Sequence, residues 1–306
     1  MNSHFVSQLL VATVALGAPL LLAALGELIS ETAGVINIEL EGMMLCGAFA
    51  GVLGAYETGS VAFGFLAAAV GGLFLAAVHG VTSLVFGANQ VVSGIVLNIF
   101  ALGLTSFLLT TVLGSTISPV SSPPALRVPG LADIPGIGKA FFDQNGVVYA
   151  AYLLVPVVWW VLNRTTLGLS LKAAGERPQA AESLGVLVVP MRWLALVACG
   201  VLAGIGGGLL ALGSIGFFTQ NMTAGRGFIA LAAVVFGRWR PFGTAAAVLL
   251  FALADAFQIR VQALGIVHIP FQFLVMLPYL VTLVALAGLL RRMRPPSALG
   301  VNYVPE

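Results

Sequence analysis

Long stretches without charge are the feature of this sequence that most constrains its fold. The uncharged stretches are 5–26, 58–86, 88–113, 146–163, 193–216, 241–254 and 264–290. A helix that crosses a bilayer needs about 20 apolar residues, and only 8% of this chain is charged, where a soluble domain carries roughly 25%. The sequence therefore predicts an integral membrane protein, which excludes a soluble enzyme, a nucleic-acid binder and a disordered linker.

The uncharged stretches are continuously apolar and rich in Leu, Ala and Gly, whereas the strands of a membrane β-barrel alternate with period two over about 10 residues. We therefore expect an all-α, polytopic helical fold that forms a single transmembrane domain over 1–306. The predicted number of spans is about seven to nine, including broken or re-entrant helices. Segment 226–237 is too short to span and is predicted to be a re-entrant or half helix. A membrane protein tolerates such an element only where it is buried or lines a wet cavity.

The basic residues orient the chain. Nine of the thirteen lie in three short segments: Arg164, Lys172, Arg177 and Arg192; then Arg238 and Arg240; then Arg291, Arg292 and Arg294. The positive-inside rule places all three segments, and with them the carboxy terminus, in the cytoplasm. Segment 164–192 is then a cytoplasmic loop, and the proline-rich segment 114–145 is an external loop.

Polar residues inside membrane segments are functional candidates, because burying them in lipid is costly. Glu27, Glu31, Asn37, Glu39 and Glu41 crowd into 27–41, which is either an interfacial loop or a broken helix whose break lines a pathway. A second group lies in an otherwise apolar helix and consists of Asn89, Gln90, Ser93 and Asn98. These side chains either hydrogen-bond neighbouring helices or line a solute path. The predicted pathway residues are Asn37, Glu41, Asn89, Gln90, Ser93, Asn98, Gln220, Asn221, Asp255 and Gln258. For Asp255 the alternative is pairing with Arg226 or Arg260.

The glycines at 200, 204 and 206–208 do not form a phosphate-binding loop, because no Lys-Ser or Lys-Thr follows them. Their small-xxx-small spacing, repeated at Gly47 and Gly51, instead predicts close helix packing. We find no metal-ligand spacing and no nucleophile elbow, HExxH motif or paired carboxylates, so catalysis within this chain has no support in the sequence.

The longest cytoplasmic segment, NRTTLGLSLKAAGERPQAAESLGVLVVPMRW (163–193), is amphipathic. Pro178 is suited to the first turn of a helix, and Gly185 is suited to end one. We expect a short helix over Gln179–Leu184, which either docks into a partner's groove or forms part of a plain solvated loop.

Four segments together resemble the membrane permease subunits of bacterial ABC importers, in the branched-chain amino acid, ribose and nucleoside permease family. They are LGELISETAGVINIELEGMML (25–45), GANQVVSGIVLNIFALGLTSFLL (87–109), LGLSLKAAGERPQAAESLGV (167–186) and GRGFIALAAVVFGRWRPFGTAAAVLLFALADAFQIRVQ (225–262). The chain is most similar to the shorter of the two permeases of nucleoside-type importers. The external loop 114–145 carries the least of the resemblance.

The resemblance implies a multi-pass subunit of the bacterial inner membrane that works with ATPase subunits, a second and longer permease chain, and an external solute-binding protein. Mg-ATP would bind to the ATPase subunits, with no cofactor in this chain. The segment that contacts the ATPase would include Lys172, Glu176, Arg177, Pro178, Gln179, Ala180, Ala181 and Gly185. Gln179 stands where importer permeases carry Glu, so the resemblance supports contacts by Ala180, Ala181 and Gly185 more than a salt bridge at 179.

Neutral polar lining residues suit a nucleoside, and they suit a sugar equally. Two other classes stay open at this point. An ion-coupled secondary transporter would carry its ion on Glu31, Glu41 or Asp255. A membrane anchor without transport would tolerate Asn98→Leu.

Overall fold

The computed structural model describes residues 3–114, 119–264, 276 and 294–304. Its helices are α1 (Ser3–Thr32), α2 (Leu40–Thr58), α3 (Val61–Gly80), α4 (Gln90–Leu108), α5 (Gly138–Phe142), α6 (Gly146–Arg164), α7 (Thr166–Glu176), α8 (Pro178–Ser183), α9 (Val188–Ser214), α10 (Arg226–Phe236) and α11 (Pro241–Leu264). One-turn π-helices η1 (Val81–Val85) and η2 (Leu109–Leu113) extend α3 and α4. The short strands β1 (Ala125–Arg127) and β2 (Asp143–Asn145) pair antiparallel.

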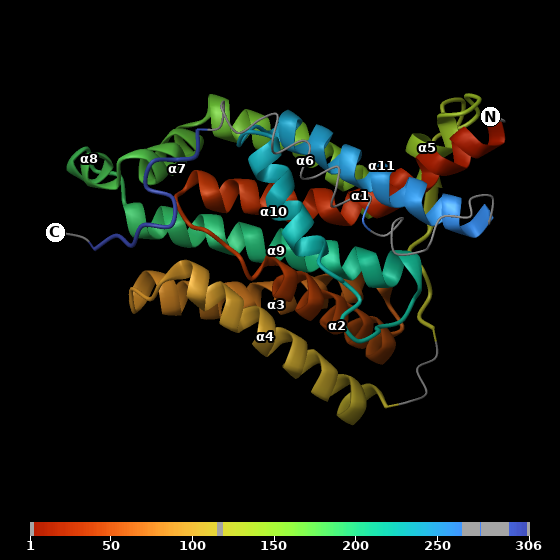
Figure 1. The fold of residues 1–306 in the computed structure, drawn as a ribbon, viewed down its shortest axis with the longest axis horizontal. Helices are drawn as coiled ribbons and strands as arrows, with labels where there is room; N and C mark the ends of the chain where they lie inside the picture. The colour runs from red at the N-terminus through yellow and green to blue at the C-terminus, as the bar shows by residue number, and fades with distance from the viewer. Residues whose placement is uncertain (1–2, 115–118, 265–275, 277–293, 305–306) are drawn as a thin grey trace.

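The described part of the chain is a bundle with α1 and α9 at its centre. In the apolar windows of α1 and α9, 67% of residues are buried, against 28% in α3, α4 and α6. Helix α9 packs against α1, α2 and α3, and Figure 1 shows these helices running along the long axis with α4 splayed to one side. Lightly buried apolar helices are expected where a membrane protein faces lipid or another subunit. We therefore expect the outer faces of α3, α4 and α6 to contact lipid or a second subunit.

Six helices of the described residues are long and apolar enough to cross a bilayer: α1, α3 with η1, α4 with η2, α6, α9 and α11. This agrees with the predicted all-α polytopic fold, but the predicted count of seven to nine spans is not confirmed. The span expected over 264–290 lies almost wholly outside the described residues.

Glycines let the central helices touch backbone to backbone, as their spacing predicted. A Cβ on Gly47 of α2 would lie 2.4 Å from the carbonyl oxygen of Gly204 in α9, and a Cβ on Gly72 of α3 would lie 2.1 Å from that of Gly200. No side chain fits at such distances, so these positions fix how closely α2, α3 and α9 approach.

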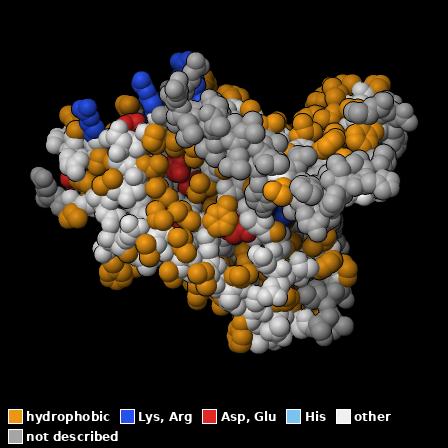
Figure 2. Space-filling model, viewed as in Figure 1, with side chains coloured by type: hydrophobic (Ala, Val, Ile, Leu, Met, Phe, Trp, Pro, Cys, Tyr) orange, Lys and Arg blue, Asp and Glu red, His pale blue; other side chains and the backbone are white. Residues whose placement is uncertain are grey.

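The two ends of the bundle differ in charge. Figure 1 places α7, α8 and the carboxy-terminal tail at one end, and the amino terminus and α5 at the other. Lys and Arg side chains project from the first end in Figure 2. The described parts of the basic segment 164–192 and of the loop 114–145 therefore lie at opposite ends of the bundle. Which side of the membrane each end faces stays a prediction, and Arg291 and Arg292 lie outside the described residues.

Two interruptions break the pattern of full-length helices. Helix α1 ends at Thr32, and the buried, non-helical segment 33–39 leads to the start of α2. Helix α10 has only 11 residues and packs against α1, α2 and α11. The short helix expected over 226–237 is therefore present. Of the two interpretations of 27–41, the burial of the non-helical segment favours a broken helix over an interfacial loop.

Candidate functional site

Side chains from other parts of the fold hold the backbone of the break at 33–39. The Gln90 side-chain oxygen accepts a bond from Ile36 N (2.8 Å), and Glu27 accepts one from Asn37 N (3.2 Å). Asn98 donates to Ile38 O (2.9 Å) and accepts from Gly42 N in the first turn of α2 (2.7 Å). A backbone group buried without a partner is costly, so these polar side chains are what allows the chain to unwind inside the bundle.

The polar face of α4 is thus turned toward this break. Of the pathway residues predicted there, Gln90 and Asn98 bind backbone, and Asn89 caps the helix through bonds from Val91 N and Val92 N. Ser93 lies 2.7 Å from the Thr82 hydroxyl. The hydrogen-bonding interpretation of this group therefore has direct geometric support.

A buried polar chain continues from the break into α3. The Asn37 side-chain amide has one orientation in which both its oxygen and its nitrogen find hydrogen-bond partners. In that orientation the nitrogen donates to the Glu39 carboxylate and lies 2.7 Å from each oxygen. Glu39 lies 3.2 Å from His79 Nδ1, and both side chains are fully buried. His79 Nδ1 is also 3.4 Å from the Ser93 hydroxyl. Sequence reasoning missed His79, whose only signal was a lone imidazole in an apolar helix.

Glu41 joins the two interrupted elements at their amino-terminal ends. One carboxylate oxygen accepts bonds from the Thr223 hydroxyl (2.6 Å) and Gly225 N (2.8 Å), and the other accepts from Gly227 N (2.6 Å). Gly225 precedes α10 with φ of 86°, a conformation that favours glycine. A carboxylate at a helix amino terminus meets free N–H groups and the positive end of the helix dipole, so Glu41 anchors α10 to α2.

The other acidic candidates also have partners. Asp255 of α11 lies 3.9 Å from an Arg226 guanidinium nitrogen, which is the structural pairing considered for it. Glu31 accepts a bond from the Trp239 indole nitrogen at 2.5 Å. Gln258 is half-buried on α11.

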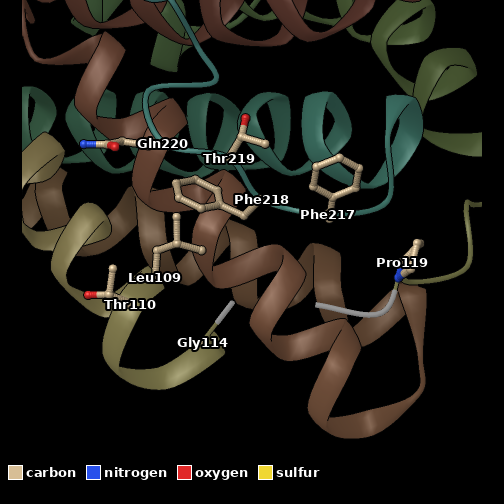
Figure 3. Close-up of a pocket in the computed structure, with 8 residues that line it drawn as sticks. All are labelled: Leu109, Thr110, Gly114, Pro119, Phe217, Phe218, Thr219 and Gln220. Carbon is tan, nitrogen blue, oxygen red and sulfur yellow. The ribbon is translucent and has the colours of Figure 1, made fainter. Parts of the chain in front are cut away.

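A cavity of about 780 Å³ lies toward the end of the bundle opposite the basic segments. Figure 3 shows the described lining residues, which come from η2, the start of the external loop and the chain before α10: Leu109, Thr110, Gly114, Pro119, Phe217, Phe218, Thr219 and Gln220. None of them is charged. Among the predicted pathway residues, Gln220 lines this cavity, and Asn221 follows it with a left-handed φ of 54°.

The basic end carries the short helix expected in segment 164–192. Pro178 is the first residue of α8, and Gly185 follows the helix with φ of 85°. Gly185 N and Val186 N donate back to Glu182 O (2.8 Å) and Ala181 O (3.0 Å), which closes the last turn. The local sequence signals therefore predicted this helix within one residue.

The residues predicted to contact an ATPase are partly exposed and partly buried around α8. Gln179, Ala180 and Gly185 are exposed, as are Glu176 and Arg177, whereas Pro178 and Ala181 are buried. Sequence reasoning missed Leu184 and Leu187, which are 85% and 69% exposed beside Gly185. Lys172 lies on α7, where partial burial lowers the pKa of its ammonium group.

The carboxy-terminal tail ties this end together. Ala298 N donates to Gly175 O (2.8 Å), Gly300 N donates to Gly34 O (3.0 Å), and Val301 O accepts from the buried Arg192 (2.8 Å). Tyr303 packs with Ala174, Ala181 and Val188, and its hydroxyl donates to Glu182. The tail thus connects α7 and α8 to the break at 33–39, a link that no local pattern in the sequence indicated.

Comparisons with known proteins match nearly the whole chain. The family model for the permease component of branched-chain amino acid transport systems matches residues 9–288. The guanosine ABC transporter permease protein NupQ of Bacillus subtilis is 38% identical over 98% of both chains. The nucleoside ABC transporter permease protein NupC of Lactococcus lactis is 37% identical over 99% of both chains. TsgC13 of Haloferax volcanii, named provisionally as a glucose ABC transporter permease protein, is 42% identical over 86% of this chain and 80% of its own.

Proposed function

The chain belongs to the family of permease components of branched-chain amino acid transport systems, and we propose that it is the transmembrane subunit of an ABC importer for nucleosides. The relatives named for guanosine and nucleosides align over essentially their full length, which supports one transmembrane domain of the same extent. The relative named for glucose covers less of this chain at similar identity, so a sugar is the competing solute.

The cavity of about 780 Å³, called the outer cavity from here on, is the observation that favours a nucleoside as the solute. Its described lining combines an aromatic ring at Phe217 with hydroxyl and amide groups at Thr110, Thr219 and Gln220, and it has no charged side chain. Aromatic rings stack on nucleobases, with about 1–3 kcal/mol per base in nucleic-acid complexes. Amide and hydroxyl groups can bond a base edge and ribose hydroxyls. A neutral, partly aromatic solute fits this lining better than an ion.

The described contacts argue against an ion-coupled secondary transporter. Glu31 and Glu41, which would have to bind the ion, accept hydrogen bonds from Trp239 and from the start of α10. Asp255, the third candidate, is paired with Arg226 at 3.9 Å. An ion carrier needs acids that are free to exchange their partner, so ATP hydrolysis by separate ATPase subunits is the proposed source of energy.

We assign distinct roles to the candidate residues. Gln220 and Asn221 are proposed to meet the solute at the outer cavity. Asn37, Glu41, Gln90 and Asn98 are proposed to act indirectly, by holding the break and α10 in place, and Asn89, Ser93, Asp255 and Gln258 flank the same elements. A second permease chain would cover one of the lightly buried apolar faces, and an external binding protein would deliver the solute to the outer end.

Coupling to the ATPase is assigned to the tip of α8. A small exposed protrusion with both apolar and polar side chains lies at the basic end of the bundle and consists of Gln179, Ala180, Leu184 and Gly185. Such a protrusion is suited to bind in a groove of a partner. Glu176, Arg177 and Lys172 would surround it with charge, while Pro178 and Ala181 hold it from beneath.

The test is solute uptake by the complete transporter in proteoliposomes, supplied with ATP and its binding protein. Uptake of labelled guanosine, competed by other nucleosides and not by glucose, is the expected result. Gln220→Ala should lower uptake, whereas the matched change Gln8→Ala, an amide on α1 away from the cavity, should not. Uptake that persists without ATP and stops with an uncoupler would overturn the ABC assignment, and competition by glucose alone would overturn the nucleoside assignment.

A further inference from the structure

A second cavity, of about 660 Å³, lies at the basic end of the bundle beside α6. Its described lining comes from the last turns of α6, from Lys172 of α7 and from the turn that joins α10 to α11. The lining residues are Trp159, Leu162, Asn163, Lys172, Gly237, Arg238, Trp239, Arg240, Pro241, Phe242 and Gly243. Lys172 is the one lining residue that also borders the proposed coupling surface, and the proposed solute path uses none of the described lining residues.

The described lining is positively charged, and the acids near it lie outside the lining: Glu31 is bonded to Trp239, and Glu176 shares an adjoining pocket with Lys172 and Trp239. Lys172, Arg238 and Arg240 contribute three cations, and no Asp or Glu is among the described lining residues. The Lys172 ammonium is positioned by a bond to the Asn163 side-chain oxygen at 2.9 Å. Three cations around one hollow repel one another, so an anion seated there would be stabilised.

The backbone of the turn adds to this potential. Arg238 and Trp239 have left-handed φ values of 57° and 53°, uncommon for residues with side chains, and the Trp239 indole is fixed by its bond to Glu31. Helix α11 starts directly afterwards, and the N–H groups of Phe242 and Gly243 have no acceptor within the described part of the chain. The turn thus presents two guanidinium groups and the positive end of a helix dipole to one hollow.

The surroundings of the cavity are apolar and aromatic. Trp159 and Phe242 pack with ring centroids 6.2 Å apart, and Phe242 is 55% exposed. Leu153 of α6 and Leu249 and Leu250 of α11 are also exposed on these two packed helices. Trp residues beside basic residues, next to lipid-facing helices, are typical of the membrane–water boundary, and Figure 2 shows hydrophobic side chains close to the basic ones at this end.

From this cavity we infer a binding site for an anionic phospholipid of the cytoplasmic leaflet. The phosphate would sit between Lys172, Arg238 and Arg240 and the start of α11, and the acyl chains would run along the exposed faces of α6 and α11. Basic pockets between membrane helices on the cytoplasmic side recognise such headgroups. Because Trp239 is bonded to Glu31 near the end of α1, a bound lipid would brace the α10–α11 turn against the centre of the bundle.

The test is native mass spectrometry of the purified complete transporter in a neutral detergent. Phosphatidylglycerol is titrated against phosphatidylcholine with the same acyl chains. The wild type should bind phosphatidylglycerol preferentially. Arg238→Gln with Arg240→Gln should weaken that binding roughly thirtyfold, because each basic residue at a membrane surface contributes about fivefold.

The matched control is Arg127→Gln with Lys139→Gln, which removes the same charge from two exposed residues in the loop at the opposite end of the bundle. It should change binding about threefold or less. Equal losses in the two double variants, or equal binding of the two lipids, would refute a specific site. Displacement of the lipid by millimolar inorganic phosphate would assign the cavity to a soluble anion, and loss of the ATPase subunits from Arg238→Gln/Arg240→Gln would assign it to protein docking.

Discussion

Removing the Glu41 carboxylate tests the structural role of the link between α2 and α10. Glu41→Ala leaves the Thr223 hydroxyl and the N–H groups of Gly225 and Gly227 without their acceptor. Thr223 and Gly227 are buried, so water cannot readily replace the carboxylate there. A small alanine also leaves a void at the amino terminus of α10.

The cost follows from the number of donors left unsatisfied. A hydrogen bond to a charged group contributes about 1.5–3 kcal/mol. Counting the two buried donors as lost and the third as partly hydrated gives a destabilisation of about 3–6 kcal/mol. Glu41→Gln keeps one oxygen for Thr223 and Gly225 but sets an amide nitrogen against Gly227 N, where the present distance is 2.6 Å. It loses one charged bond, or about 1.5–3 kcal/mol.

Stability is measured by reversible unfolding of the purified transporter complex with sodium dodecyl sulfate in mixed micelles. Function is measured as solute uptake in proteoliposomes. Glu57→Ala is the matched control, because Glu57 lies on the same helix and is exposed. The expected order of stability is Glu57→Ala, then Glu41→Gln, then Glu41→Ala. If Glu41→Ala unfolds like Glu57→Ala but loses uptake, Glu41 contacts the solute and its assignment as an anchor is wrong.

Three further changes probe other parts of the structure. Leu184→Asp, at a position that is 85% exposed, should abolish solute-stimulated ATP hydrolysis without affecting assembly. Leu131→Asp in the external loop should leave hydrolysis unchanged, and equal effects of the two substitutions would show that α8 is not part of the coupling surface. Tyr303→Ala should destabilise the α7–α8 region by about 2–4 kcal/mol, measured as faster hydrogen exchange there, and unchanged exchange would contradict the tail's role. Gly204→Ala should impair folding because its Cβ would lie 2.2 Å from Ala68 O, whereas Gly103→Ala, with open space around it, should express normally in a fluorescence-detected size-exclusion assay.

Sequence reasoning succeeded where the signal was local. Pro178 and Gly185 bracket α8 because one fits a first helical turn and the other a left-handed ending. The short helix over Arg226–Phe236 followed from its length between two basic segments. The glycine spacing predicted close helix packing, and the structure adds that Gly47 and Gly204 are partners in it. Each of these features depends on a few neighbouring residues or on a repeat along one helix.

Sequence reasoning could not say what the buried polar residues bind. Whether Gln90 faces a solute or a backbone depends on where the break at 33–39 lies, and those elements are 54 residues apart. Glu41 meets α10 across 184 residues, and the tail reaches Arg192 across 109. Such partners follow from the assembled bundle, so the composition of a helix face identifies a polar group without identifying its partner.

The contacts of these polar groups narrow where solute selectivity can arise. A break in a membrane helix exposes backbone groups, and every one left unpaired costs free energy in a medium without water. In this chain Glu27, Gln90 and Asn98 are bonded to the break, and Glu41 is bonded to α10. Side chains already committed in this way cannot bond a passing solute without releasing the backbone they hold. Selectivity is therefore expected at the outer cavity, where the side chains of Gln220 and Thr219 hold no backbone group of the described residues. Substitutions there should change which solute is taken up, whereas substitutions at the break should change stability first.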